Sequence, residues 1–226
     1  RNTFDYIIDI PVDHNDPANL RKFANEWQVF HLTPFKETIK LEADLLFTRS
    51  IDHWWTAFRL KNICLSTGTK NYFGINSTIR KYRELFDANN LPDVYNGLMY
   101  FRFSRQAQTF FESARYIQQE WEYVKTGLKN CIEDLPSTDV MYALAALTVG
   151  EENVTMPSMD FINFVHMKPG IQGWSEDRAW YETVMSEQDG DIIRINNLNQ
   201  YDPVHYYDKN YATDELIKYY ERRRHN

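Results

Sequence analysis

Cysteine and long apolar runs are both scarce in this chain of 226 residues. Cys64 and Cys131 are the only two cysteines and form no Cys-x-x-Cys pair, so neither a disulfide framework nor a zinc site is expected. Such scarcity is typical of a reducing compartment. No stretch approaches the roughly 20 apolar residues of a membrane span, and no signal peptide opens the chain. We therefore expect a cytoplasmic protein without a membrane segment.

Positive charge is also in short supply, because 25 Lys and Arg face 32 Asp and Glu, for a net charge of −7. This balance argues against a broad phosphate-binding surface. The three consecutive arginines Arg222, Arg223 and Arg224 are interpreted as a solvated tail. Aromatic residues are plentiful instead, with 15 Tyr, 14 Phe and 6 Trp. They argue against disorder and fit either a packed core or a ring-lined pocket.

Segments with strand and helix patterns alternate along the chain, which favours one α/β domain. The expected strands are 4–10, closed by Pro11, then 38–49, 63–67, the apolar run 91–102, and a final core strand at 161–166. The expected helices are 21–32, 53–58, 106–124, 140–149 with Ser137 or Thr138 as N-cap, and 213–224. The polar segments 12–20 and 71–80 are expected to be loops, and polar turns follow residue 170.

Two carboxylates interrupt the second of these expected strands, at Glu42 and Asp44. Side chains two residues apart on a strand point the same way, so both would face one spot beside a buried sheet. Two acids held together repel each other unless a positive charge sits between them. A divalent cation that prefers oxygen ligands would fill that place. The alternative is a pair of ordinary salt bridges to Lys40 or Arg49.

The order of four features along the chain resembles the GT-A nucleotide-sugar glycosyltransferases. These features are Glu42-x-Asp44, Asn96-Gly97 within an apolar run, a helix start at Thr138-Asp139, and a late histidine. Retaining members related to glycogenin and the bacterial galactosyltransferases are nearest in arrangement, and the resemblance covers residues 4–210. It implies a Rossmann-like mixed central sheet flanked by helices, followed by a C-terminal helix or tail at 211–226.

The resemblance implies a Mn²⁺ or Mg²⁺ ion that bridges the two phosphates of the donor. Asp44 matches the second acid of the family's motif, and Glu42 replaces the first. Because Glu is longer by one methylene, Glu42 contacts either the metal or, instead, a water or the ribose. His205 is the candidate for a further metal ligand, with Lys209 gripping a phosphate. The segment His166-Met167-Lys168-Pro169-Gly170 is a rival for that role, since the family's motif also combines His, Gly, Lys and Pro.

Two further matches imply contacts to the transferred sugar, and we assign catalytic roles to Asn96 and Asp139. Asn96 would touch the sugar while Gly97 lets the backbone approach closely, although a turn or bulge in a strand explains this pair equally well. Thr138 and Asp139 would bind sugar hydroxyls, although an acid in a first helical turn also simply complements the helix dipole. Retaining transfer by same-face attack needs no protein base, because the leaving phosphate can take the proton.

One departure from the family concerns its first strand and the following loop, which contact the nucleotide base. Nothing before Arg1 supplies them, and the chain has no initiator Met, so we expect the numbered chain to begin inside a domain that lacks its N-terminal strand. Residues 35–44 and the triplet His53-Trp54-Trp55 also resemble proteins of large tailed bacteriophages.

The expected function is metal-dependent transfer of a sugar from a nucleotide diphosphate donor, a UDP-sugar above all, to an acceptor hydroxyl. For a phage protein acting in the host cytoplasm, that acceptor could be a hydroxymethylated pyrimidine in DNA. One alternative is a non-catalytic interaction domain of GT-A shape. Another is a metal-dependent hydrolase or nuclease, which would need more clustered carboxylates and a nearby His or Lys base. The sugar, the stereochemical outcome and the oligomeric state are left open.

Overall fold

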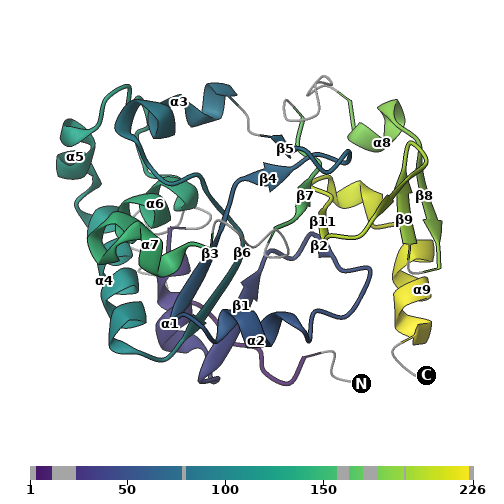
Figure 1. Cartoon of the computed structure of the whole chain (residues 1–226), viewed down its shortest axis with the longest axis horizontal. Coiled ribbons are helices and arrows are strands. Elements are labelled where there is room, and N and C mark those ends of the chain that lie inside the picture. The colour runs from purple at the N-terminus through teal and green to yellow at the C-terminus, as the bar shows by residue number, and fades with distance from the viewer. Residues whose placement is uncertain are drawn as a thin grey trace.

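A computed structural model describes residues 4–11, 24–77, 80–156, 163–169, 178–190 and 192–223 and shows a mixed α/β fold. Helices gather on one side of a central sheet, and smaller sheets with the last helix lie on the other side (Figure 1). The strands are β1 (Glu37–Leu41), β2 (Leu45–Leu46), β3 (Ile63–Thr67), β4 (Thr69–Lys70), β5 (Asn76–Ser77), β6 (Val94–Arg102), β7 (Val165–His166), β8 (Ser186–Asp189), β9 (Ile192–Ile195), β10 (Leu198–Gln200) and β11 (Val204–His205). The α-helices are α1 (Val29–Leu32), α2 (Trp54–Phe58), α3 (Arg80–Asn89), α4 (Arg105–Gln119), α5 (Trp121–Val124), α6 (Thr138–Val149), α7 (Glu151–Val154), α8 (Trp180–Thr183) and α9 (Asp214–Arg223), and short 3₁₀ turns lie at η1 (Glu26–Gln28), η2 (Lys125–Gly127) and η3 (Lys209–Tyr211).

The central sheet has the order β1-β6-β3, and both pairings are antiparallel. Its middle strand, β6, is buried at every residue except Arg102, which explains why the sequence there is a continuous apolar run. Tyr100 of β6 lies opposite Ile39 of β1 and Cys64 of β3. This sheet carries the turn at the end of β1 that forms one wall of the site.

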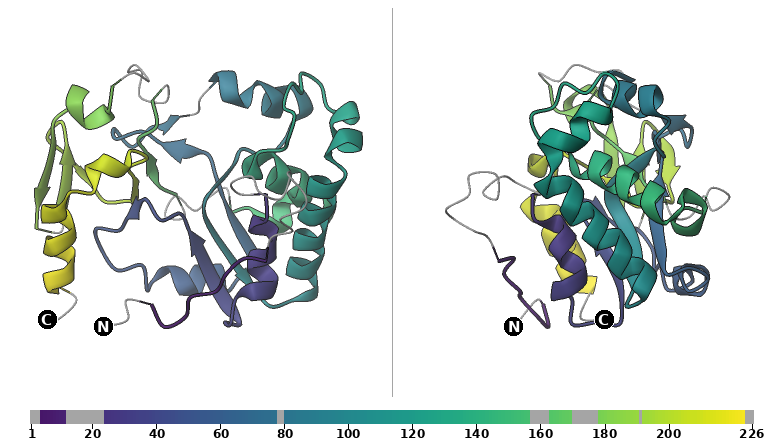
Figure 2. Two further views of the ribbon diagram at one scale, coloured as in Figure 1. Left: turned by 180° about the vertical axis from the view of Figure 1, so that it is seen from behind. Right: turned by 90° about the vertical axis from the view of Figure 1, so that its left-hand side faces the viewer.

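A helical layer covers one face of the central sheet, as the right-hand view of Figure 2 shows. The oxygen of the Ser104 side chain accepts the Ala107 N–H at 3.2 Å and so caps the start of α4. The Ser137 side chain caps α6 in the same way, accepting the N–H of Val140 at 3.3 Å. Phe110 of α4 packs against Tyr142 of α6, with their ring centroids 5.4 Å apart. The predicted helices at 106–124 and 140–149 are therefore confirmed, although the first ends at Gln119 and α5 follows it.

The opposite face of the sheet carries a smaller aromatic cluster. Phe58 of α2 is fully buried and stacks on Tyr100 at 4.8 Å between ring centroids. Trp54, one turn earlier, packs edge-on against Phe58 at 6.0 Å. Phe164 belongs to the same cluster and also lines the pocket described below.

Two more sheets complete the fold beyond the central one. The sheet β2-β11-β7-β4-β5 is mixed, because β11 pairs antiparallel with β2 but parallel with β7. The sheet β10-β9-β8 is antiparallel. A third core cluster joins the two, with Ile193 and Ile195 of β9 packed beside Trp180 and Val204.

The predicted strand at residues 4–10 is wrong. Residues 4–11 form no strand in the structure, and Ile7 is 84% exposed. The Tyr6 ring packs edge-on against Phe35, and the Gln28 amide donates to the Pro11 carbonyl at 2.9 Å. The alternation of apolar and acidic residues suits a strand, but a strand also needs a neighbour that satisfies its backbone N–H and C=O groups, and no strand of the described residues provides one.

Several elements were missed in segments that the sequence presents as polar. Helix α3 was not predicted, β5 lies inside the predicted loop 71–80, and β8, β9 and β10 lie where turns were expected, so β7 is not the final strand. Polar residues interrupt the apolar pattern of these elements, and β8 alternates half-buried and exposed side chains, which gives a weaker signal than a buried run. Loop 12–20, residues 21–23 of the first predicted helix, residues 161–162 of the predicted strand, Gly170 and Arg224 lie outside the described residues.

Both cysteines are free thiols, with Cys64 buried and Cys131 half-buried. Burial raises the pKa of the Cys64 thiol to about 12. Among the described helices, none combines the length and the apolar character that crossing a membrane requires.

Candidate metal centre and pocket

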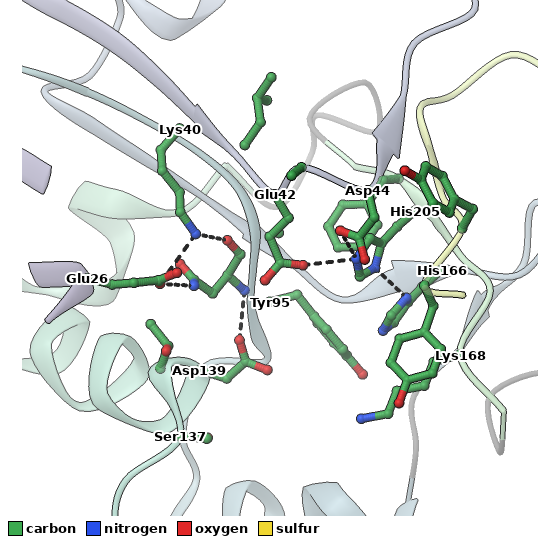
Figure 3. Close-up of a pocket in the computed structure, with 18 of the residues that line it drawn as sticks. Glu26, Lys40, Glu42, Asp44, Tyr95, Ser137, Asp139, His166, Lys168 and His205 are labelled. Atoms are coloured by element: carbon green, nitrogen blue, oxygen red, sulfur yellow. Dashed lines mark hydrogen bonds and ion pairs between the residues drawn. The ribbon is translucent and has the colours of Figure 1, made fainter. Parts of the chain in front are cut away.

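The structure brings every site residue proposed above to the wall of one pocket with a volume of about 900 Å³. Its walls come from the turn after β1, the first half of β6, the start of α6, the strands β7 and β11, and the segment after β11. Figure 3 shows side chains entering it from several of these elements. The proposed site residues that line it are Glu42, Asp44, Asn96, Gly97, Thr138, Asp139, Lys168, His205 and Lys209.

A turn, and not a continuous strand, places the two carboxylates together. Residues 42–44 form no strand between β1 and β2, and β2 ends at Leu46, so the predicted strand 38–49 is wrong at 42–44 and at 47–49. The Glu42 N–H donates to the Gly97 carbonyl at 3.0 Å, and the Leu45 N–H returns to the Glu42 carbonyl at 3.3 Å. The turn directs the side chains of Glu42 and Asp44 to a common point, as the two-residue repeat of a strand would also do. The Glu-x-Asp spacing alone therefore could not distinguish a turn from a strand.

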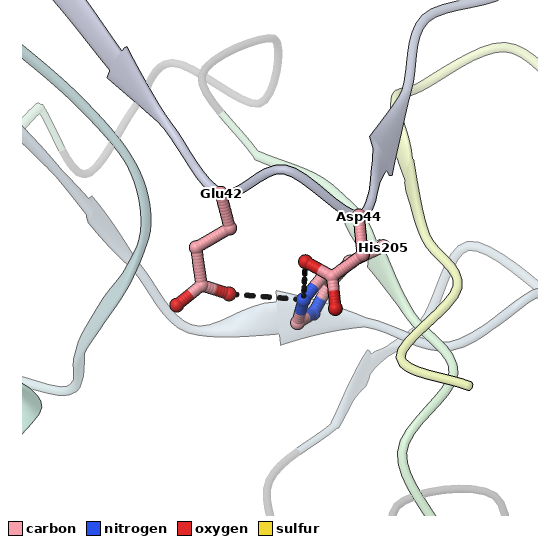
Figure 4. A group of neighbouring side chains, drawn as sticks. All are labelled: Glu42, Asp44 and His205. Atoms are coloured by element: carbon pink, nitrogen blue, oxygen red, sulfur yellow. Dashed lines mark hydrogen bonds and ion pairs between the residues drawn. The ribbon is translucent and has the colours of Figure 1, made fainter. Parts of the chain in front are cut away.

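That common point is the imidazole of His205, on β11. Its Nε2 lies 2.9 Å from Oε2 of Glu42 and 2.9 Å from Oδ1 of Asp44 (Figure 4). One ligand atom from each of the three residues lies within 4.8 Å of the others. Because β11 pairs with β2, with His205 opposite Leu45, the hydrogen bonds between these strands hold the imidazole beside the turn. The proximity predicted for Glu42, Asp44 and His205 is thus observed.

The charges of this cluster are strongly coupled. Burial, the largest single effect, disfavours the imidazolium, but hydrogen bonds and charge from Asp44 and Glu42 outweigh it and raise the pKa of His205 to about 9. Burial alone would raise the pKa of Glu42, but the hydrogen bond and the charge of His205 lower it below its ordinary value. A proton on His205 therefore supplies the positive charge that two adjacent carboxylates require.

The same three groups can hold a divalent cation in place of that proton. Cation-to-ligand distances of about 2.1 Å place neighbouring ligand atoms about 3 Å apart in an octahedron, close to the 2.9 Å that separates His205 Nε2 from each carboxylate. Two carboxylates and one imidazole fill three coordination positions of such a cation and leave the others for a substrate and water. The chemistry of this donor set therefore fits a metal that is open to the pocket.

The second histidine of interest, His166, does not face the carboxylates. It lies on β7 directly beside His205, and the two Nδ1 atoms are 2.8 Å apart. Burial, the positive charge of His205 and that of Lys168 hold the pKa of His166 well below its ordinary value, so its ring is neutral. His166 thus lies next to the proposed ligand set and outside it, so the geometry favours His205 over His166 as the candidate metal ligand.

Asn96 and Gly97 form a bulge within a continuous strand. Leu65 of β3 pairs with Met99, but Thr67 pairs with Val94, so four residues of β6 oppose a single residue of β3. No turn interrupts β6, and the shifted register is compatible with the alternative of a bulge raised for this pair. Gly97 makes room for the Phe164 ring, because a Cβ atom there would lie 3.0 Å from Phe164 Cζ.

Replacing Gly97 by Ala should destabilise the protein. The added methyl group would press on Phe164, which is 1% exposed and packs edge-on against His205 at 5.7 Å between centroids. We expect a loss of about 1–3 kcal/mol in the free energy of unfolding, measured by urea denaturation. Gly127→Ala is the matched control, because a Cβ there meets nothing within 4 Å. Equal stability of the two variants would contradict the packing role assigned to Gly97.

Asp139 occupies the first turn of α6, behind the Ser137 cap, and both of its oxygens are bound. Oδ1 accepts the Asn96 backbone N–H at 2.7 Å, and Oδ2 lies 3.3 Å from Nη2 of Arg83. The Arg83 guanidinium is 2% exposed, lies 3.5 Å from the Tyr95 ring centroid, and donates to the Val94 carbonyl at 2.8 Å. Arg83 was missed by the sequence analysis, since it lies in a helix that was not predicted.

Glu26 and Lys40 form a second charged wall of the pocket. Lys40 Nζ pairs with Glu26 at 3.4 Å and donates to the Asn96 carbonyl at 2.9 Å, so its salt bridge is with Glu26 and not with Glu42. The Asn96 side-chain amide donates to Glu26, which orients the amide oxygen away from that carboxylate. Burial raises the pKa of Glu26 against the opposing effect of Lys40. In Figure 3 this wall faces Asp44, His166 and His205 across Glu42.

Two further lysines lie on the side of His205. Lys168 follows β7, is half-buried, and holds its ammonium 5.6 Å from the Tyr207 ring centroid. Lys209 begins η3 and is exposed. Their positive charge enters a pocket that also carries the carboxylates of Glu42 and Asp44.

The pH dependence of stability follows from the raised pKa of His205. Its ordinary value is 6.5 and its folded value about 9, so protonation stabilises the folded, metal-free protein fully below pH 6.5. That contribution is lost as the pH rises through 9. We expect urea midpoints in EDTA to fall over this interval in the wild-type protein, and less in His205→Gln. A parallel fall in both proteins would contradict the assignment.

No protein-family model, no curated protein and no solved structure matches this chain.

Proposed function

We propose that the protein transfers a sugar from a nucleoside diphosphate donor to an acceptor hydroxyl, with a divalent cation held by Glu42, Asp44 and His205. The observation that carries this proposal is the convergence of these three side chains at one pocket. At about 900 Å³, the pocket is near the upper end of ordinary ligand sites, roughly 300–1,000 Å³, and suits a molecule of nucleotide-sugar size. The resemblance to GT-A enzymes supports the same assignment.

Mn²⁺ is the cation that we favour, with Mg²⁺ as the alternative. Carboxylate oxygens suit both ions, whereas an imidazole nitrogen favours a transition metal. When bound, the cation would stabilise the negative charge that develops on the diphosphate as the sugar bond breaks. His205 must give up its Nε2 proton to the solvent for this, while Glu42 and Asp44 keep their charges.

The remaining residues of the pocket divide into two groups by charge. Lys168 and Lys209 would bind the phosphate oxygens, because they bring positive charge to the His205 side of the pocket. Asn96, Thr138 and Asp139 line the opposite part, where amide, hydroxyl and carboxylate groups suit sugar hydroxyls. The Asn96 Oδ1 atom is buried and has no hydrogen-bond partner among the described residues, so it retains the capacity to accept a hydrogen bond.

A hydrolytic function is the competing proposal. The described residues hold one cluster of metal-binding type, with three ligand residues, and the described pocket adds Lys40, Lys168 and Lys209 as possible bases. Water attack at the same centre would release the sugar without an acceptor. The presence or absence of an acceptor requirement therefore separates transfer from hydrolysis.

The test is an activity assay with nucleotide sugars. The protein is incubated with Mn²⁺ and, in turn, UDP-, GDP- and ADP-sugars, and release of the nucleoside diphosphate is followed with and without acceptors. Hydroxymethylated DNA and simple glycosides are included as acceptors. We expect release from one donor, UDP-sugars first, to require both Mn²⁺ and an acceptor. Release without any acceptor would indicate hydrolysis, and no release from any donor would contradict the proposal.

A further inference from the structure

His166 lies close to the proposed cation site but outside its ligand set. Its Nδ1 approaches Nδ1 of His205 at 2.8 Å, while Nε2 of His205 points to Glu42 and Asp44. A hydrogen bond between two ring nitrogens requires that one carries the proton and the other accepts it. If His205 binds a cation through Nε2, its proton must be on Nδ1. Nδ1 of His166 is then the acceptor.

We propose that His166 is a positioning residue, whose Nδ1 accepts the Nδ1–H of His205 and keeps the Nε2 lone pair of His205 aimed at the cation. This inference rests on the proposed metal site and assigns a residue that supports it from behind. A histidine that binds a metal commonly donates its other N–H to an acceptor, which fixes both the ring orientation and the tautomer.

The backbone holds the two rings side by side. β7 and β11 run parallel with His166 and His205 in register, and the Met167 N–H donates to the His205 carbonyl at 3.0 Å. The ring centroids are 4.5 Å apart at 26°. Both residues are 6% exposed, so water has little access to compete for the hydrogen bond.

Aromatic neighbours close the remaining directions. The Phe164 ring packs edge-on against His166 at 5.8 Å and against His205 at 5.7 Å between centroids. Tyr95 packs edge-on against His166 at 6.0 Å. These contacts restrict rotation of both imidazoles, so they support the orientation of the pair before a cation arrives.

The first experiment compares Mn²⁺ binding by His166→Asn and His166→Leu. The two side chains have nearly the same shape, but only Asn offers an oxygen acceptor near the position of Nδ1. Free Mn²⁺ is measured by electron paramagnetic resonance, and unfolding in EDTA checks that each variant is folded. We expect the Leu variant to bind Mn²⁺ about 10–100-fold more weakly than the wild type, and the Asn variant to retain most of the affinity.

The outcomes separate this inference from the proposed function. If the wild-type protein binds no Mn²⁺, the metal site itself is wrong and His166 has nothing to position. If the wild type binds but the two variants bind equally, whether tightly or weakly, His166 acts through packing alone and the inference is overturned.

A second measurement needs no variant. In the wild-type protein with ¹⁵N-labelled histidine and saturating Mg²⁺, long-range ¹H–¹⁵N spectra report the tautomer of each ring. We expect His166 to carry its proton on Nε2 and His205 on Nδ1. A proton on Nδ1 of His166 would overturn the inference even if both variants failed to fold.

Discussion

Asp44→Asn should lower the affinity for Mn²⁺ by more than about 100-fold and remove transfer activity, because loss of a ligand costs more than the 10–100-fold typical of its supporting groups. The substitution keeps the shape of the side chain and removes its charge. Oδ1 of Asp44 lies 2.9 Å from Nε2 of His205, and Asn can still accept that hydrogen bond. The fold should therefore persist while the ligand set loses an anion. Mn²⁺ binding is measured by electron paramagnetic resonance.

Asp52→Asn is the matched control, because Asp52 is exposed and bonds the Ser50 hydroxyl away from the pocket. Its Mn²⁺ affinity should equal that of the wild type. Glu42→Gln separates the two roles considered for Glu42. If Glu42→Gln loses as much Mn²⁺ affinity as Asp44→Asn, Glu42 is a metal ligand. A small loss of Mn²⁺ affinity would instead indicate that Glu42 contacts the ribose or a water. Unchanged Mn²⁺ affinity in Asp44→Asn would remove Asp44 from the metal site.

Arg83→Met should cost about 3–5 kcal/mol in the free energy of unfolding, because it leaves a partly buried carboxylate without its counter-charge. Arg83 lies 3.3 Å from Asp139 and 3.3 Å from Asp93, and its guanidinium fills the space between Tyr95 and Phe86. Met has a similar length and apolar character, so the cost should come mainly from the lost charge. Urea denaturation at pH 7 measures it.

A surface pair provides the comparison for this prediction. Arg59→Met removes a bidentate partner of Glu37 that lies in solvent, where the Arg59 side chain is 56% exposed. Its stability should change little, because exposed ion pairs are screened. If Arg83→Met is as stable as Arg59→Met, Arg83 does not compensate the charge of Asp139.

The strong local patterns in the sequence predicted the central elements. The apolar run at 91–102 became β6, Ile63–Thr67 became β3, and the periodicity of α4 and the N-cap of α6 were readable because each depends on neighbours along the chain. Residues 4–10 failed for the opposite reason. Whether an alternating segment becomes a strand depends on a partner that its own sequence does not contain.

The convergence of Glu42, Asp44 and His205 could be predicted from the sequence, but the contacts around them could not. Glu42, Asp44 and His205 could be proposed together because the resemblance orders them, although 161 residues separate Asp44 from His205. The contact between His166 and His205 depends on the parallel register of two strands, each of two residues. Glu26 lines the pocket from a 3₁₀ turn, and Arg83 pairs with the pocket residue Asp139 from a helix, and neither element carried a motif. Such contacts are set by packing, which local sequence specifies only weakly.

The central claim is that the Glu42, Asp44 and His205 cluster binds a cation that in turn holds a nucleoside diphosphate. Calorimetric titration of the protein with UDP, GDP and ADP, first with Mn²⁺ and then with EDTA, tests it most directly. We expect one nucleotide to bind with Mn²⁺, and its binding to be lost in EDTA and in Asp44→Asn. Equal binding in Mn²⁺ and EDTA, or no binding of any nucleotide, would contradict it.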